Sequence, residues 1–172
     1  MKRILLITVI SFSVNYSYSQ SKQLKEMVDS LRFIYTSNLC SSNIYWRIIA
    51  HGQEAIPILI DKLADTSIIF INLPCKKTKK SNVAEVAYQA LNEIAEWPTA
   101  YITHMQFDLI NNGCWNFYDW FYDNRNKITY QKMVKDWYKE NKAKYKLCKL
   151  KKKEITDCEL KNRVRSRLIW YN

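Results

Sequence analysis

The side chains that could do acid–base or nucleophilic chemistry are few in this chain. His51 and His104 are its two histidines. A nucleophile needs a base within hydrogen-bond reach and a third group that orients the base. His51 stands at the end of a predicted helix, where an imidazole is stabilised by the helix dipole. His104 could pair with Asp108, with Cys114 as a nucleophile, but no second motif supports that site. We therefore predict no catalytic residue and a protein that is not an enzyme.

Cofactor and metal sites are disfavoured by the spacing of glycine, cysteine and histidine. The chain has only two glycines and no G-x-G, which excludes a phosphate-binding loop and a dinucleotide-binding fingerprint. It also has no C-x-x-C pair, and its two histidines are far apart in the sequence. We therefore predict no cofactor and no metal ligands.

The stretch "CWNFYDWFYDNR", from Cys114 to Arg125, places six aromatic residues in eight positions. At 100° per residue on a helix, Phe117, Trp120 and Phe121 share one side. Aromatic residues cover most of the circumference, which favours a core helix and predicts burial of Phe117 and Phe121. The other side remains a candidate interaction surface, formed by Trp115, Tyr118 and Tyr122. A carbohydrate binder or hydrolase that uses the aromatic residues of 115–122 remains an alternative.

The first twenty residues have the pattern of a secretory signal. Lys2 and Arg3 precede an apolar stretch that is too short to span a bilayer, and small residues follow it. We predict a signal peptide over residues 1–19, cleaved near Ser19 and Gln20. The mature chain is then periplasmic or secreted and has no transmembrane segment.

Five cysteines follow the predicted cleavage site, and export favours disulfides. The odd number leaves at least one thiol free or intermolecular. The sequence does not choose among the pairings. Cys148 with Cys158 is the simplest local pair, and Cys75 with Cys114 would join two loops.

Positive charge is concentrated at the C-terminus. Residues 139–172 contain 12 Lys and Arg against 4 Asp and Glu, whereas residues 20–138 are nearly neutral. Leu160, Val164 and Leu168 recur at i, i+4 and i+8, which suggests an amphipathic helix within a basic tail over residues 148–172. An anionic envelope surface is one candidate partner, whereas nucleic acid is disfavoured because no binding motif is present. The candidate contact residues are Lys151, Lys152, Lys153, Arg163, Arg165 and Arg167.

Helical periodicity dominates the rest of the chain. Apolar stripes predict helices in segments 21–35, 42–51, 53–64, 82–96 and 128–147. Gly52 is placed to end the second, and Asn82 with Glu85 fits a capping box. Residues 65–80 break the period, and we predict a long loop there. A single α-helical domain over residues 20–147 follows.

Two of these helical segments show a family resemblance. "GQEAIPILIDKLAD" at 52–65 and "VAEVAYQALNEI" at 83–94 together resemble HEAT-like repeat proteins over about residues 42–96. The resemblance implies antiparallel helix pairs and a role in protein interaction. The expected fold is therefore all-α, a compact array of HEAT-like pairs. The expected function is an exported, non-enzymatic module that binds another protein, such as an inhibitor or an immunity-type protein. The alternative is an envelope-surface or anionic-ligand binder that acts through the basic tail.

Overall fold

The computed structural model describes residues 21–36, 38–73, 75, 80–109, 114–162 and 164–171. The predicted signal peptide over residues 1–19 lies outside these residues. Residues 21–29 are helical. The later helices are α2 (Asn43–Ala50), α3 (Ile56–Asp61), α4 (Val83–Ile94), α5 (Thr99–Thr103), α6 (Phe117–Tyr122), α7 (Asn124–Asn141) and α8 (Asp157–Lys161). Short 3₁₀ turns are η1 (Ser30–Phe33), η2 (Leu39–Ser41), η3 (Gly52–Ala55), η4 (Lys142–Lys144) and η5 (Lys152–Glu154).

The prediction of an all-α fold is wrong, because the described residues also form two antiparallel sheets of two strands each. β1 (Ile68–Phe70) pairs with β2 (Lys80–Asn82), and Ile69 lies opposite Ser81. β3 (Tyr145–Lys149) pairs with β4 (Ser166–Trp170), and Leu147 lies opposite Leu168. The fold is a mixed one, in which helices predominate and the sheets are small.

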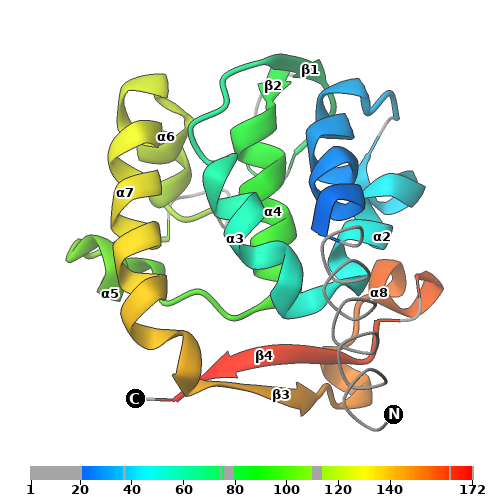
Figure 1. Ribbon diagram of the computed structural model, residues 1–172. Coiled ribbons are helices and arrows are strands. Elements are labelled where there is room, and N and C mark those ends of the chain that lie inside the picture. Colours follow the sequence, from blue (N-terminus) through cyan, green and yellow to red (C-terminus); the bar gives the residue numbers. More distant parts are fainter. Residues whose placement is uncertain are drawn as a thin grey trace, which may run out of the picture.

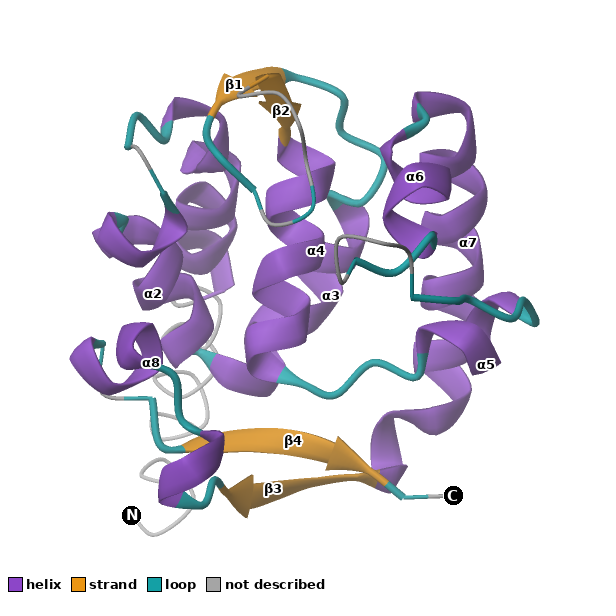
Figure 2. Ribbon diagram, turned by 180° about the vertical axis from the view of Figure 1, so that it is seen from behind, coloured by secondary structure: helices purple, strands orange, loops and turns teal. Residues whose placement is uncertain are grey.

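The helices α3 and α4 form the centre of the molecule (Figure 1). Helix α2 and the N-terminal helix lie on one side of this pair, and α6 and α7 lie on the other. The β3–β4 sheet crosses one end of the helices, and the β1–β2 sheet lies at the opposite end (Figure 2). Helix α4 therefore contacts elements from both halves of the chain.

The predicted helical stripes are confirmed where they were most regular. All six apolar positions of the α4 stripe are buried, namely Val83, Val86, Ala87, Ala90, Leu91 and Ile94. The side chain of Asn82 accepts from the backbone of Glu85, and Glu85 bonds back to Asn82, which is the capping box. Gly52 adopts a φ of 54° after α2, a conformation that glycine takes without steric cost.

The prediction of a long loop over residues 65–80 is wrong, because β1 lies in this segment and β2 begins at Lys80. Burial alternates from Ile68 to Leu73, with Ile69, Ile71 and Leu73 inside. The sequence hides this alternation, since the outward residues Ile68 and Phe70 are apolar as well. The partner strand β2 has the sequence Lys-Ser-Asn, which has little intrinsic preference for strands.

The C-terminal segment is folded into the body of the protein and is not an amphipathic helical tail. Helix α8 ends at Lys161, and β4 pairs with β3 across the predicted domain boundary at residues 147 and 148. Leu168 is buried and accepts a hydrogen bond from the backbone of Glu96. Apolar residues at intervals of four fit both a helix and a strand, since four is also a multiple of two. The spacing of Leu160, Val164 and Leu168 was therefore ambiguous.

One of the two disulfide predictions is confirmed and the other is wrong. Cys75 and Cys114 are bonded, whereas Cys158 pairs with Cys40, and Cys148 is the free thiol among the described cysteines. The second pairing was based on closeness in the sequence alone, but Cys148 lies on β3 and Cys158 lies on α8. The two disulfides are consistent with an exported protein. No helix in the described part of the chain is long and apolar enough to cross a membrane.

Candidate binding pocket

A pocket of about 500 Å³ lies where α4, α5 and the start of α6 meet. Helix α4 contributes Tyr88 and Asn92, and residues 97–101 form a second wall. Phe107 and residues from the 115–118 segment complete the lining. Seven of its eleven lining residues are aromatic: Tyr88, Trp97, Tyr101, Phe107, Trp115, Phe117 and Tyr118.

The floor of the pocket is held by aromatic packing around Phe117. The Phe117 ring lies 5.1 Å from the ring of Tyr88 and 5.1 Å from the ring of Phe107, the latter in an edge-on arrangement. It also stacks on Phe121 at 5.5 Å. Such pairs add stability beyond the burial of their area. The burial predicted for Phe117 and Phe121 is confirmed, and this packing gives the pocket a fixed wall.

The pocket is lined by uncharged side chains. No charged side chain lines it among the residues that the structure describes. The hydroxyl of Tyr88 lies 3.4 Å from Thr99 Oγ1, and Asn92 Nδ2 donates to the Tyr88 carbonyl. Burial raises the pKa of Tyr88 to about 12, so its phenol is neutral at physiological pH. The pocket therefore offers apolar rings and a few neutral polar groups, a composition typical of ligand pockets.

The rim of the pocket exposes large apolar side chains. Tyr101 is 54% exposed and Trp115 is 50% exposed. Leu109 is 62% exposed and forms a β-bridge with Trp115. Large apolar residues gathered at one rim are typical of interaction sites, whereas apolar residues scattered singly over a surface need no explanation. We call Tyr101, Leu109 and Trp115 the apolar rim.

Two of the three aromatic candidates lie in this pocket. Trp115 and Tyr118 line it, whereas Tyr122 does not and packs against Tyr118 at 5.7 Å. Sequence reasoning missed Tyr88, Trp97, Tyr101 and Phe107. Trp97 and Tyr101 are four residues apart directly after the end of α4, and this spacing was the available signal.

The Cys75–Cys114 disulfide anchors the segment that carries Trp115 of the apolar rim. Cys114 directly precedes Trp115, and the bond ties it to Cys75 with a Cα–Cα distance of 5.6 Å. Because Cys114 is oxidised, it is not the thiol nucleophile that was considered beside His104. His104 adopts a left-handed φ of 54° at the end of α5. Asp108 is therefore not one helical turn away from it.

The basic candidates are distributed over different environments. Lys151, Lys152 and Lys153 are exposed on and beside η5, and Arg165 is exposed before β4. Arg167 is partly buried, and its Nη2 lies 2.8 Å from Glu159 and 3.5 Å from Glu93. Arg163 lies outside the described residues. The three lysines and Arg165 are thus exposed to solvent, whereas Arg167 is paired within the fold.

No protein-family model, curated protein or solved structure matches this chain. The HEAT-like resemblance therefore stays a prediction.

Proposed function

We propose that this chain is an exported, non-enzymatic module that binds another protein and inserts a partner's apolar side chain into the aromatic pocket. The observation that carries the proposal is the apolar rim around an uncharged pocket. Aromatic residues are enriched in protein interfaces, and anchors that fill a pocket supply much of the binding energy.

Site-specific photo-cross-linking tests this proposal. With p-benzoylphenylalanine at Tyr101 or Trp115, we expect the same single cross-linked partner from the native envelope or medium. The matched control carries the probe at Tyr35, which is 92% exposed on the side of the N-terminal helix. Replacing Tyr101 and Trp115 by alanine should weaken binding of the purified partner by at least roughly tenfold. Identical cross-links from position 35, or none from the rim, would contradict the proposal.

A second candidate function is binding to an anionic envelope surface. It is favoured by the exposed run Lys151, Lys152 and Lys153, together with exposed Arg165 nearby in the chain. Clustered lysines attract anionic lipid head groups, and salt weakens that attraction.

Vesicle sedimentation tests this second function. Binding to vesicles with anionic phospholipid should fall steeply between low and physiological salt, and fall roughly tenfold when Lys151, Lys152 and Lys153 become glutamine. The control variant makes the same change in charge on α7, at Lys132, Lys135 and Lys139, which are also exposed. Equal losses in the two variants would show a general charge effect and would exclude a site at η5.

A further inference from the structure

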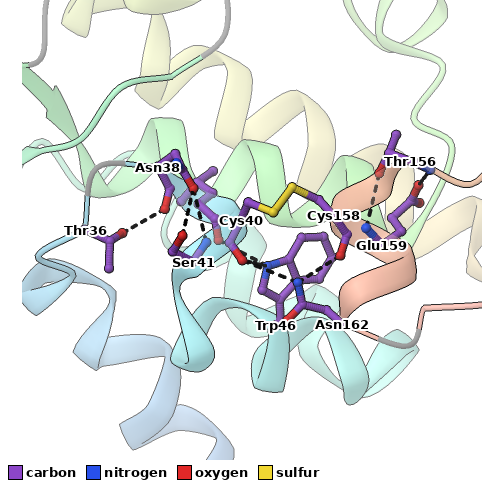
Figure 3. Close-up of a disulfide and its surroundings, with 10 residues drawn as sticks. Thr36, Asn38, Cys40, Ser41, Trp46, Thr156, Cys158, Glu159 and Asn162 are labelled. Carbon is purple, nitrogen blue, oxygen red and sulfur yellow. Dashed lines mark hydrogen bonds between the residues drawn. A yellow bond between two sulfur atoms is a disulfide. The ribbon is translucent and has the colours of Figure 1, made fainter.

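A second cavity, of about 630 Å³, lies beside the Cys40–Cys158 disulfide and on a different face of α4 from the aromatic pocket. The disulfide joins η2 to α8, with Trp46 and Asn162 beside it (Figure 3). Trp46 Nε1 donates to the carbonyls of Leu39 and Cys40, which fixes the indole in the wall. Leu39, Leu73 and the disulfide complete an apolar surface.

The same cavity is lined by polar groups on α4. Gln89 and Glu93 are one helical turn apart and both line it, together with Tyr45 of α2. Gln89 Nε2 is buried and has no hydrogen-bond partner among the described residues. Buried donors in folded proteins are nearly always paired. An acceptor atom of a bound molecule would satisfy this one.

Among the residues that the structure describes, the charges beside the cavity are not balanced. Arg167 Nη2 lies 2.8 Å from Glu159 Oε1 but 3.5 Å from Glu93 Oε2. Glu159 is fully buried, and its other oxygen accepts from the backbone of Thr156. One guanidinium therefore faces two carboxylates, and Glu93 makes the weaker contact. Burial, together with the charge of Glu159, raises the pKa of Glu93, while Arg167 opposes this effect. A cation in the cavity would stabilise the Glu93 carboxylate.

We propose that this cavity binds a small organic amine whose ammonium group pairs with Glu93. An acceptor oxygen of the ligand receives the Gln89 Nε2 hydrogen bond, and its apolar part packs on Trp46, Leu39 and Leu73. The ligand class is thus an apolar or aromatic amino alcohol or a similar amine. This site is separate from the aromatic pocket and does not depend on the proposed protein partner.

Calorimetric titration of the oxidised protein with matched probes tests the charge requirement. The amine probe is phenylalaninol, its neutral counterpart is 3-phenylpropane-1,2-diol, and its anionic counterpart is 3-phenylpropanoate. We expect phenylalaninol to bind at least roughly tenfold more tightly than the diol. The Glu93 carboxylate attracts the ammonium group, and this attraction is stronger in a partly buried site than in water. Equal binding of the diol, tighter binding of the anion, or no binding of the amine at millimolar concentration overturns the proposal.

Two variants test the assigned residues. Glu93→Gln keeps the size of the side chain and should reduce phenylalaninol affinity at least tenfold, whereas Glu140→Gln, an exposed control on α7, should not. Gln89→Met removes the amide donor. It should weaken the binding of phenylalaninol more than the binding of 2-phenylethylamine, which has no acceptor oxygen. Unchanged affinity in Glu93→Gln overturns the assignment. If that variant does not fold, the probe comparison on the unaltered protein still decides.

Discussion

Replacing both Cys40 and Cys158 with serine is expected to lower the free energy of unfolding by about 4–5 kcal/mol. The bond joins residues separated by 118 positions, and the entropy that a disulfide removes from the unfolded chain grows with loop length. The Cys75–Cys114 bond spans 39 positions and should contribute about 1 kcal/mol less. Since a domain has only about 5–15 kcal/mol of net stability, the loss is a large fraction of the total. Urea unfolding under non-reducing conditions measures it.

The double variant is preferable to either single change. A single Cys40→Ser change leaves Cys158 and Cys148 as two thiols ten positions apart, and they could form the non-native bond predicted from sequence. Cys148→Ser is the matched control, because it removes a thiol but no disulfide. We expect it to change the unfolding free energy by less than about 0.5 kcal/mol. A loss below about 1 kcal/mol in the double variant would contradict the expectation.

Removing this disulfide should also loosen one region before the rest. Asn162 Nδ2 donates to the carbonyls of both Cys40 and Cys158, so hydrogen bonds and the disulfide coincide at one junction (Figure 3). Next to this junction, Glu159 of α8 pairs with Arg167 of β4. We expect proteolytic cleavage around η5 and α8 to appear first in the double variant.

The predictable parts of the fold are those that are determined by residues close together in the sequence. Helix α4 could be placed because its apolar period, its capping box and its end at Ile94 all lie within one short stretch. The strands could not be placed, because β2 is a strand only through its pairing with β1. The position of β4 was ambiguous for the same reason. Leu168 is buried where its strand lies against the residue that follows α4, and its own segment carries no sign of this contact.

The binding pocket was predictable only in part. Trp115 and Tyr118 were identified because they lie on a different side of the predicted helix from Phe117, Trp120 and Phe121. The helix proved shorter than predicted, ending at Tyr122, and Asp123 caps α7. The remaining lining comes mainly from α4 and from residues 97–101. The residue pattern within any one of these segments does not show that they meet in space. The same limit applies to the cavity beside the disulfide, whose walls come from four regions of the chain.

The second large effect is expected at Lys127, a lysine that is fully buried in the first turns of α7. Its Nζ lies 3.2 Å from Glu85 Oε1, and both side chains are excluded from solvent. It also donates to the carbonyl of Tyr122 and to Asn124 Oδ1. Buried ion pairs add little net stability, but removing one partner leaves an uncompensated charge. Lys127→Met should therefore cost about 3–5 kcal/mol, measured by urea unfolding at pH 7.

The chain supplies a matched control for this change. Lys135 is one of the exposed lysines of α7 and lies 2.9 Å from Asp61. Lys135→Met should cost at most about 1 kcal/mol, because exposed ion pairs are weak. Adding Glu85→Gln to Lys127→Met should restore part of the lost stability, since glutamine keeps an oxygen for the Asn82 cap and carries no charge. Equal losses for the two lysine variants would contradict a dominant cost of the buried charge.

The effect of Lys127 should extend to the aromatic pocket. Its bond to the Tyr122 carbonyl holds the end of α6, and its bond to Glu85 fixes that end against the start of α4. Phe117 and Tyr118 of α6 and Tyr88 of α4 are thereby held in register across the pocket wall. In Lys127→Met, the near-ultraviolet circular dichroism of the aromatic cluster should weaken while the far-ultraviolet helix signal remains. A variant that keeps its full near-ultraviolet signal would show that aromatic packing alone positions the wall.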